Sequence, residues 1–279
     1  MLLSFVWTAV KDFALVASLF IALTACYSSK FQSLKMEIGG TTCEAQGTTF
    51  RCVRCGFPIT TLYIQYSPGN IRLMKCENCK AVADEYIECE IMILIIDLIL
   101  HKPKAYRHLF YNMFSKETLN IEGLIWKSIL GFVILDAYGI WVLSTYDKEW
   151  NANVTSLLWD FGKMFAGVLF GNLVLLCVMF VGARKFLNSS AQLYGYKDIL
   201  LGVLVSSYFK IFLVATMVWE FPSSVIFIID LFVISSNTVA LKVITYSAMI
   251  RCMAVCIMAH SIKFLVSQRL SNYPLKIVI

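Results

Sequence analysis

The segment FRCVRCGFPITTLYIQYSPGNIRLMKCENCK, residues 50–80, contains two CxxC pairs that are separated by 20 residues. Two residues between cysteines allow one tight turn, a knuckle, to aim both sulfur atoms at a single ion. Two knuckles complete a tetrahedral shell of four sulfurs, which suits Zn²⁺. Four thiolates leave no open position for water, so such a site is structural rather than catalytic. We therefore expect a structural zinc site whose ligands are Cys52, Cys55, Cys76 and Cys79.

The residues between the two pairs indicate how the knuckles are held together. TTLYIQY alternates as a strand does, SPGN at residues 67–70 is typical of a turn, and IRLMK leads back to the second pair. This pattern predicts a β-hairpin and, with the knuckles, a zinc ribbon. Gly56 follows the first pair, where a knuckle often needs a positive φ that glycine adopts without strain. Other interpretations remain: the two CxxC pairs occur by chance, they are redox dithiols, or Cys43 or Cys89 replaces one ligand.

Outside this segment the chain has the composition of a membrane protein. Of its 279 residues, 59% are hydrophobic and 15% are charged, whereas soluble domains average about half and about a quarter. Ten cysteines in such a chain favour reduced thiols over the disulfide framework of a short secreted domain. The net charge of +6 suits loops that face the cytosol, and it is too diffuse to indicate nucleic acid binding. We expect a polytopic α-helical membrane protein with a small N-terminal β zinc-ribbon module.

Apolar stretches within residues 113–279 predict the transmembrane region. We expect four or five spans there, with the last two candidates open to a re-entrant or interfacial arrangement instead. The candidates are residues 124–143, 164–183, 199–219, 223–244 and 248–266. Lysine and arginine gather in the loop before the first candidate and in the loop after the second. This distribution predicts that both loops, and the cysteine module with them, face the cytosol.

Residues 1–49 comprise an apolar N-terminal segment and a polar linker. The apolar run at residues 13–27 fits a cleaved signal peptide, an anchor or a translated extension that the mature protein does not need. The basic residues that follow favour an anchor with its downstream side in the cytosol. Residues 30–49 are rich in glycine and threonine and predict the linker.

Residues 83–112 predict an amphipathic segment at the membrane interface, directly after the ribbon at residues 50–82. IMILIIDLIL, residues 91–100, is too short to cross a bilayer and is interrupted by Asp97. HKPKAYRHLFYN, residues 101–112, interleaves basic with apolar side chains, as interfacial helices do. With such neighbours, we expect His101 and His108 to face lipid or solvent rather than a metal.

No set of residues predicts catalysis. The chain has no glycine-rich phosphate loop, no nucleophile elbow and no HExxH motif. Asp136 and Asp230 lie within apolar runs, where a charged side chain serves either a functional pathway or polar packing between helices. We expect no enzymatic activity. The alternatives are a membrane-bound enzyme of lipid metabolism that uses these aspartates, and an adaptor whose ribbon recruits protein partners.

Residues 50–112 closely resemble the homology domain of the Arv family, the ACAT-related-enzyme required-for-viability proteins, and most of all its plant members. The matching pieces are CVRCGFP, LYIQYSPGNIRLMKCENCK, ADEYIECE and IDLILHKPKAYRHLFYN. By position in these motifs, the resemblance implies that the four cysteines of the two pairs are the zinc ligands.

The resemblance also implies a function. It implies a protein of the endoplasmic reticulum membrane that acts in sterol homeostasis and in the transport of sterol toward the plasma membrane. In some members it implies a role in sphingolipid balance and in the supply of GPI-anchor intermediates. The expected partners are membrane lipids, sterol and proteins of lipid metabolism, but no nucleic acid.

Overall fold

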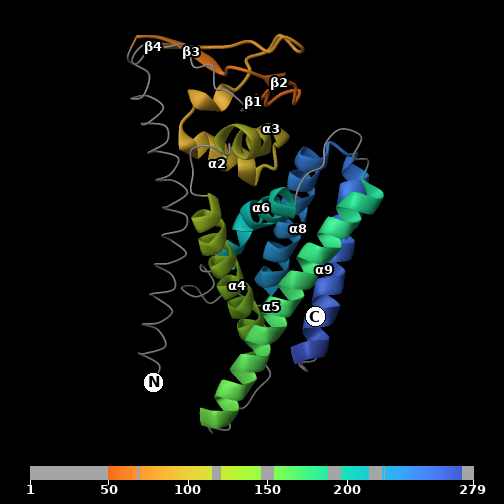
Figure 1. Cartoon of the computed structure of the whole chain (residues 1–279). Coiled ribbons are helices and arrows are strands. Elements are labelled where there is room, and N and C mark those ends of the chain that lie inside the picture. Colours follow the sequence, from red (N-terminus) through yellow and green to blue (C-terminus); the bar gives the residue numbers. More distant parts are fainter. Residues whose placement is uncertain are drawn as a thin grey trace. The chain divides into compact units, whose positions relative to one another are not determined.

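A computed structural model of the chain describes residues 50–67, 70–114, 121–145, 154–187, 196–213, 222 and 224–271 (Figure 1). The chain divides into two compact units, residues 1–124 and 125–279. The predictions for residues 1–49 lie outside the described residues. Each unit is described by itself, beginning with the one that contains the two cysteine pairs.

The described part of the first unit starts with two small antiparallel sheets (Figure 1). Strands β1 (Phe50–Arg51) and β2 (Pro58–Ile59) flank the first cysteine pair, and β3 (Tyr63–Ser67) pairs with β4 (Asn70–Leu73). In the second sheet Tyr63 lies opposite Leu73, and the register shifts between Gln65 and Ser67, next to the turn. The hairpin predicted between the two cysteine pairs is therefore confirmed.

Short helices complete the first unit. They are the 3₁₀ helix η1 (Glu85–Ile87), α2 (Ile91–Ile99), α3 (Pro103–Arg107) and the π-helical turn η2 (His108–Met113). Helix α3 begins with a proline, whose fixed φ suits the first helical position. The core of the unit joins the first knuckle to these helices, because Val53 packs there with Tyr86, Leu94 and Ala105.

Long helices make up the second unit. They are α4 (Ile121–Thr145), α5 (Val154–Phe186), α6 (Tyr196–Ser206), the 3₁₀ helix η3 (Ser207–Ile211), α8 (Ser224–Thr245) and α9 (Met249–Ser271). Helices α5 and α9 pack side by side (Figure 1). A Cβ atom on Gly182 would lie 2.7 Å from Val255 Cγ1, and one on Gly171 would lie 2.6 Å from Ser267 Oγ. These two glycines therefore allow the helices to approach as closely as they do.

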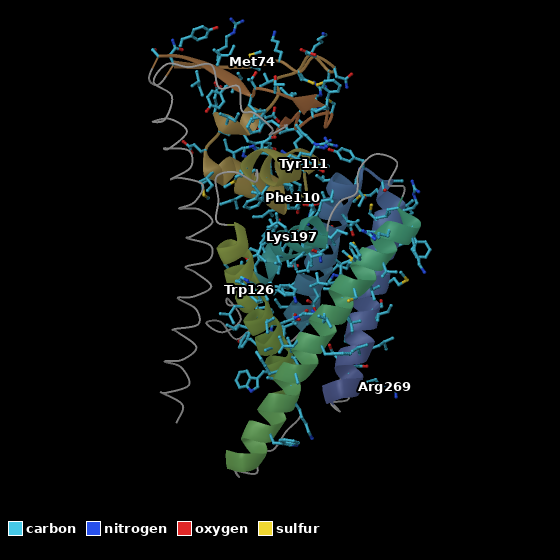
Figure 2. All side chains as sticks on the ribbon, in the orientation of Figure 1. Met74, Phe110, Tyr111, Trp126, Lys197 and Arg269 are labelled. Carbon is cyan, nitrogen blue, oxygen red and sulfur yellow. The ribbon has the colours of Figure 1, made fainter. Side chains whose placement is uncertain are left out.

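Three helices among the described residues are long and apolar enough to cross a membrane. They are Gly162–Phe186 within α5, Ser224–Thr245 (α8) and Met249–Arg269 within α9. They coincide with the predicted spans at residues 164–183, 223–244 and 248–266. Large apolar side chains are exposed on the surface of the helices. Trp126 of α4, for example, is 72% exposed (Figure 2).

The other two predicted spans have a different form. Helix α4 covers residues 124–143, and its apolar part is the shorter stretch Ser128–Trp141. In the candidate at 199–219, α6 ends at Ser206 and η3 follows; residues 214–219 lie outside the described part of the chain. The hydroxyls of Ser206 and Ser207 donate to the carbonyls of Gly202 and Val203, both at 2.6 Å. Such side-chain bonds to the preceding turn compete with the regular α-helical pattern.

Candidate metal centre

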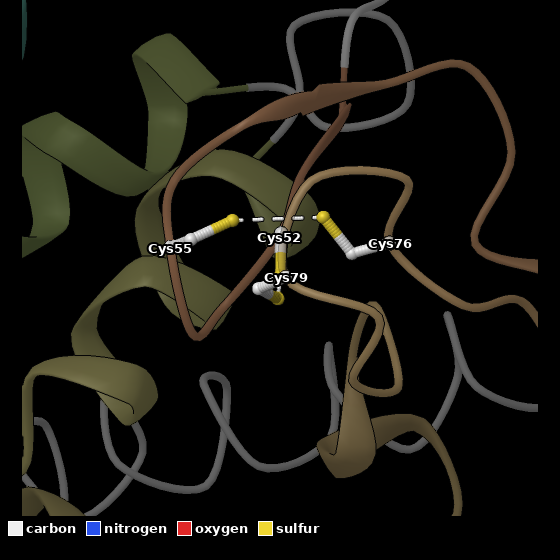
Figure 3. A group of neighbouring side chains, drawn as sticks. All are labelled: Cys52, Cys55, Cys76 and Cys79. Atoms are coloured by element: carbon white, nitrogen blue, oxygen red, sulfur yellow. Dashed lines mark hydrogen bonds between the residues drawn. The ribbon is translucent and has the colours of Figure 1, made fainter.

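The four cysteines of the two pairs come together in the first unit (Figure 3). Their sulfur atoms all lie within 4.8 Å of one another, with 3.7 Å between Cys52 and Cys79 and 3.5 Å between Cys55 and Cys76. A tetrahedral zinc site with Zn–S bonds of about 2.3 Å places its sulfurs about 3.8 Å apart. The distances are too long for disulfides, and all four thiols are free. The cluster is therefore compatible with a metal site.

The two knuckles have the same backbone structure. In the first, the amide of Gly56 donates to Cys52 O at 2.8 Å, and the amide of Cys52 donates to Phe57 O at 2.9 Å. In the second, Lys80 donates to Cys76 O at 2.9 Å, and Cys76 donates to Ala81 O at 2.8 Å. Each residue of the second knuckle lies 24 positions after its counterpart in the first. The chain thus contains two copies of one ligand-presenting turn.

The residue after each pair adopts a left-handed backbone conformation. Gly56 has φ of 79°, as predicted, and Lys80 has φ of 59°. The second could not be foreseen from the sequence, because lysine is rarely found at a positive φ. Both residues donate the amide bond that closes their knuckle. The conformation is therefore required by the turn rather than by the residue type.

A buried carboxylate, that of Asp84, holds the helical half of the unit against the sheets. It accepts hydrogen bonds from the Tyr86 amide at 3.0 Å and from the Asn112 side chain at 2.6 Å, and it pairs with His108 Nδ1 at 2.7 Å. The Asn112 side chain also bonds both backbone polar groups of Arg51, at 2.9 and 3.0 Å. These bonds connect η2 directly to the strand that leads into the first knuckle.

The prediction that His108 faces lipid or solvent is wrong. Its side chain is buried, and its Nδ1 faces the carboxylate of Asp84. The basic residues around it suggested an interfacial histidine, whereas the acidic partner lies 24 positions earlier in the chain. His101 is half-buried at the turn between α2 and α3. Neither histidine belongs to the sulfur cluster.

Arg107 stabilises the first knuckle by hydrogen bonds to its backbone. Its guanidinium donates to Val53 O at 2.9 Å and to Arg54 O at 2.7 Å. These carbonyls belong to the two residues between Cys52 and Cys55. A charged donor on both carbonyls fixes the turn that aims the first two sulfurs. The sequence pattern placed Arg107 only in the interfacial segment and did not reveal this role.

The remaining cysteine of the described part of this unit, Cys89, is not in the cluster. Its thiol donates to Glu85 O at 3.2 Å. Burial and the nearby carboxylates of Glu85 and Asp84 raise the pKa of this thiol. Cys43, the other alternative ligand, lies outside the described residues.

Helix α2 is fixed to the unit through Asp97. Its carboxylate accepts from the Tyr86 hydroxyl at 2.8 Å and pairs with Lys102 at 2.7 Å. Partial burial alone would raise the pKa of Asp97, but the bonds from Lys102 and Tyr86 outweigh it and lower the pKa below its usual value. Burial and the same carboxylate raise the pKa of Tyr86.

In the second unit, Asp136 of α4 pairs with two lysines. Its two oxygens contact Lys210 of η3 and Lys263 of α9, the latter at 2.5 Å. Both ammonium groups also lie over the ring of Phe132, at 4.4 and 5.4 Å from its centre. This arrangement is the polar packing between helices that was one of the two interpretations of Asp136. Asp230, by contrast, has an exposed side chain on α8.

Two buried asparagines of the second unit differ in their surroundings. Asn237 of α8 contacts the hydroxyls of Ser206 and Ser207, and its Nδ2 lies 3.0 Å from His260 Nε2. Asn172 of α5 is also buried. Within the described residues, however, neither the nitrogen nor the oxygen of its amide has a hydrogen-bond partner.

The fold and the site together define a mostly helical chain with three helices able to cross a membrane and a small β module built on four clustered cysteines. A family model described as Arv1-like matches residues 51–241. The chain therefore belongs to the Arv1-like family, as its resemblance to the Arv homology domain suggested.

Individual relatives agree with this assignment. Protein ARV 1 of Arabidopsis thaliana is 50% identical over 218 residues, which cover 78% of this chain and 87% of the relative. Protein ARV 2 of the same plant is 51% identical over 217 residues, or 78% and 93% of the two chains. Protein ARV1 of Homo sapiens is 29% identical over 214 residues, covering 72% and 74%. No solved structure matches the chain.

Proposed function

We propose that this protein acts in sterol homeostasis at the endoplasmic reticulum membrane and promotes the movement of sterol toward the plasma membrane. Membership of the Arv1-like family is the observation that carries the proposal. The three long apolar helices support a place in a membrane. Sphingolipid balance and the supply of GPI-anchor intermediates are further roles that the same family assignment suggests. The protein itself is not an enzyme in this proposal.

The metal in the proposal is Zn²⁺, held by Cys52, Cys55, Cys76 and Cys79. Four sulfurs at these distances suit a tetrahedral thiolate site, and zinc is the common occupant of such sites. The metal would replace part of the hydrophobic core that a module of this size cannot build. Burial raises the pKa of the Cys52 thiol to about 12, so a bound cation is what would keep this sulfur ionised near neutral pH.

The module faces the cytosol in this proposal. Support comes from the distribution of lysine and arginine in the loops around the first two predicted spans. A module on this side would meet a membrane surface that carries anionic lipids. Sterol and other membrane lipids are its expected ligands, either directly or through proteins of lipid metabolism.

An adaptor function is a second candidate, because the hairpin carries exposed side chains of the kind found in protein contacts. Ile64 of β3 is exposed on the same face as its partner Arg72 of β4, and Tyr66, at the register shift of β3, is 64% exposed. Aromatic, aliphatic and arginine side chains together are typical of protein contact surfaces. An enzyme that uses Asp136 is less well supported, because both oxygens of that carboxylate are engaged by lysines.

The test is rescue of cells that lack their own family member. Wild type is compared with Cys52→Ser/Cys76→Ser at matched protein levels, and sterol is measured in the endoplasmic reticulum and in the plasma membrane. We expect the wild type to restore the distribution and the double variant to fail. An unchanged sterol distribution with well-expressed, correctly located wild type would contradict the proposal.

A third variant, Ile64→Ser/Tyr66→Ser, tests the adaptor function separately from the role of the metal. This variant leaves the cysteines and the core of the module in place. If the open hairpin face recruits a protein, the variant should lose rescue while it retains its metal. Full rescue by the variant would argue against the adaptor.

A further inference from the structure

Helix α2 presents an apolar stripe that the described residues leave exposed. Its residues Met92, Ile93, Ile96, Ile99 and the following Leu100 are between 38% and 60% exposed. Their spacing of one, four, seven and eight residues from the first places them on one side of a helix. The stripe carries no charged residue. A helix of a soluble domain would ordinarily turn these side chains toward its core.

The opposite side of α2 is fixed, so the helix cannot rotate to bury the stripe. Leu94 is buried in the core beside Val53, which lies inside the first knuckle. Asp97 is held by Tyr86 and Lys102. Exposure of the stripe therefore follows from how the module folds.

The rest of the predicted interfacial segment has a different role. Ala105, Tyr106, Leu109 and Met113 are buried, as is His108. Arg107 and Asn112 bond the backbone of the first knuckle and of the strand before it. Of the segment at residues 83–112, α2 is thus the part that offers apolar side chains to a partner.

A lipid bilayer is the partner that fits this stripe. The helices that follow in the same chain are able to cross a membrane, so the first unit is tethered to one. At nine residues α2 is about 14 Å long, which is too short to cross a bilayer and sufficient to lie in its interface. Lys102 and Lys104 follow the stripe immediately and pair with Asp97 and Glu85 of the same unit, so no unpaired charge follows the apolar side chains directly.

We infer that α2 inserts its stripe into the bilayer interface and that the metal-held first knuckle sets its orientation through the small core that Val53 and Leu94 share. Metal binding thereby controls the membrane contact of the first unit. Without the metal the knuckle opens, Leu94 loses its support, and the stripe is no longer presented as one surface. This inference rests on the proposed metal and adds a role for it.

The experiment places a photo-crosslinking p-benzoyl-phenylalanine at Ile96 of the full-length protein in nanodiscs of phosphatidylcholine and phosphatidylserine. A second sample carries it at Tyr66, which is 64% exposed but lies on the hairpin. We expect lipid adducts from position 96 and few from position 66. A chelator that removes the metal should lower the yield at position 96. Adducts with protein instead of lipid, or a yield that the chelator does not change, would overturn the inference.

A variant tests the stripe without touching the knuckles. Ile93→Asp/Ile99→Asp alters two exposed positions, so the metal content should equal that of the wild type. Lipid adducts from position 96 should fall about tenfold or more, because two apolar contacts with lipid are lost. Metal content is measured on every sample. A wild-type protein that binds no metal would refute the proposed zinc site, whereas unchanged adducts from the variant would refute the insertion of α2.

Discussion

Gly56 and Lys80 both have a positive φ angle, and this angle affects the stability of the module. Both residues close a knuckle with φ near 60–80°. A residue with a Cβ atom is strained in this conformation by roughly 1–2 kcal/mol. We expect Gly56→Ala to weaken the module by about that amount and Lys80→Gly to leave it unchanged or slightly more stable. The measurement is the chelator concentration that removes half of the metal.

The two variants act as each other's control, since they exchange the residue type at equivalent positions of the two knuckles. Their effects should have opposite sign or differ clearly in size. Equal losses of metal from both variants would show that the left-handed conformation is not what matters at these positions.

Asp97 makes the stability of the first unit depend on pH. Its pKa is lower in the folded than in the unfolded chain, so its contribution is fully present above the unfolded value of about 3.9. The contribution is lost as the pH falls through the folded value. The wild type should therefore exceed Asp97→Asn in stability by about 1 kcal/mol near pH 6, and the difference should shrink below about pH 4.

Thermal unfolding of both proteins between about pH 3 and pH 6 checks this expectation. Any metal held by the cysteines would be released in acid from both proteins alike, so the two unfolding curves are compared only by their difference. A difference that stays constant over the whole range would mean that Asp97 acts through packing rather than charge.

Residue-scale prediction from the sequence succeeded where the chemistry is local. The spacing within a CxxC pair and the glycine after it specify one turn, and Cys52, Cys55 and Gly56 lie as expected. It failed for His108, because a side chain's partner across 24 positions leaves no local pattern. The sequence contained only a weak signal: Asp84 follows the small apolar run Ala81-Val82-Ala83, but Glu85 comes directly after it.

At the scale of helices, Asn172 and Asn237 can be compared as two similar positions in different surroundings. Both are buried on candidate spans, but only Asn237 has partners among the described residues. An unpaired buried amide is unfavourable by about 1–3 kcal/mol. We expect Asn172→Leu to raise the melting temperature and Asn237→Leu to lower it, since the latter leaves Ser206, Ser207 and His260 without their contact. Thermal unfolding in one detergent measures both, and a stabilised Asn237→Leu would show that these contacts contribute nothing to stability.

The ion pairs of Asp136 should behave as a single structural element. Replacing one member of a buried pair leaves uncompensated charge and is unfavourable by about 3–5 kcal/mol. We expect Asp136→Leu to destabilise the second unit strongly, because Lys210 and Lys263 lose their counter-charge. The triple variant Asp136→Leu/Lys210→Leu/Lys263→Leu should regain most of the stability.

The triple variant also separates structure from catalysis. If Asp136 serves packing only, the triple variant should still rescue sterol distribution once it is stable. If the triple variant is stable but does not rescue, this result would instead support the hypothesis that the protein is an enzyme that uses Asp136. Thermal unfolding and the rescue assay are therefore performed on the same set of variants.

Helices were predictable from the sequence to the extent that hydropathy determines them. A run of about twenty apolar residues specifies its own span, and α5, α8 and α9 lie where expected. The change from α6 to η3 was not predictable, because it depends on serine hydroxyls that bond the preceding turn. The pairing of α4 with η3 and α9 through Asp136 was equally hidden, since Lys210 and Lys263 lie 74 and 127 positions away.

For the molecule as a whole, two compact units predict two separate responses to metal loss. Chelation should open the first unit, whose core includes the knuckle residue Val53, and leave the second unit folded. Limited proteolysis should then cleave within residues 50–114 at low protease concentration while the helices of residues 154–271 stay intact. Cys52→Ser/Cys76→Ser should show the same pattern without a chelator. Simultaneous loss of both units would mean that they depend on each other for stability.

The order of the two units along the chain has a consequence for how the protein is made. All four clustered cysteines precede residue 80, and the first of the three long apolar helices begins at Gly162. A ribosome that adds about 5–20 residues each second needs roughly 4–16 seconds for the residues in between. The ligands are therefore all synthesised before that helix exists. The supply of a metal during translation, rather than in the finished protein, would then decide how many chains have a folded first unit when the three long helices insert.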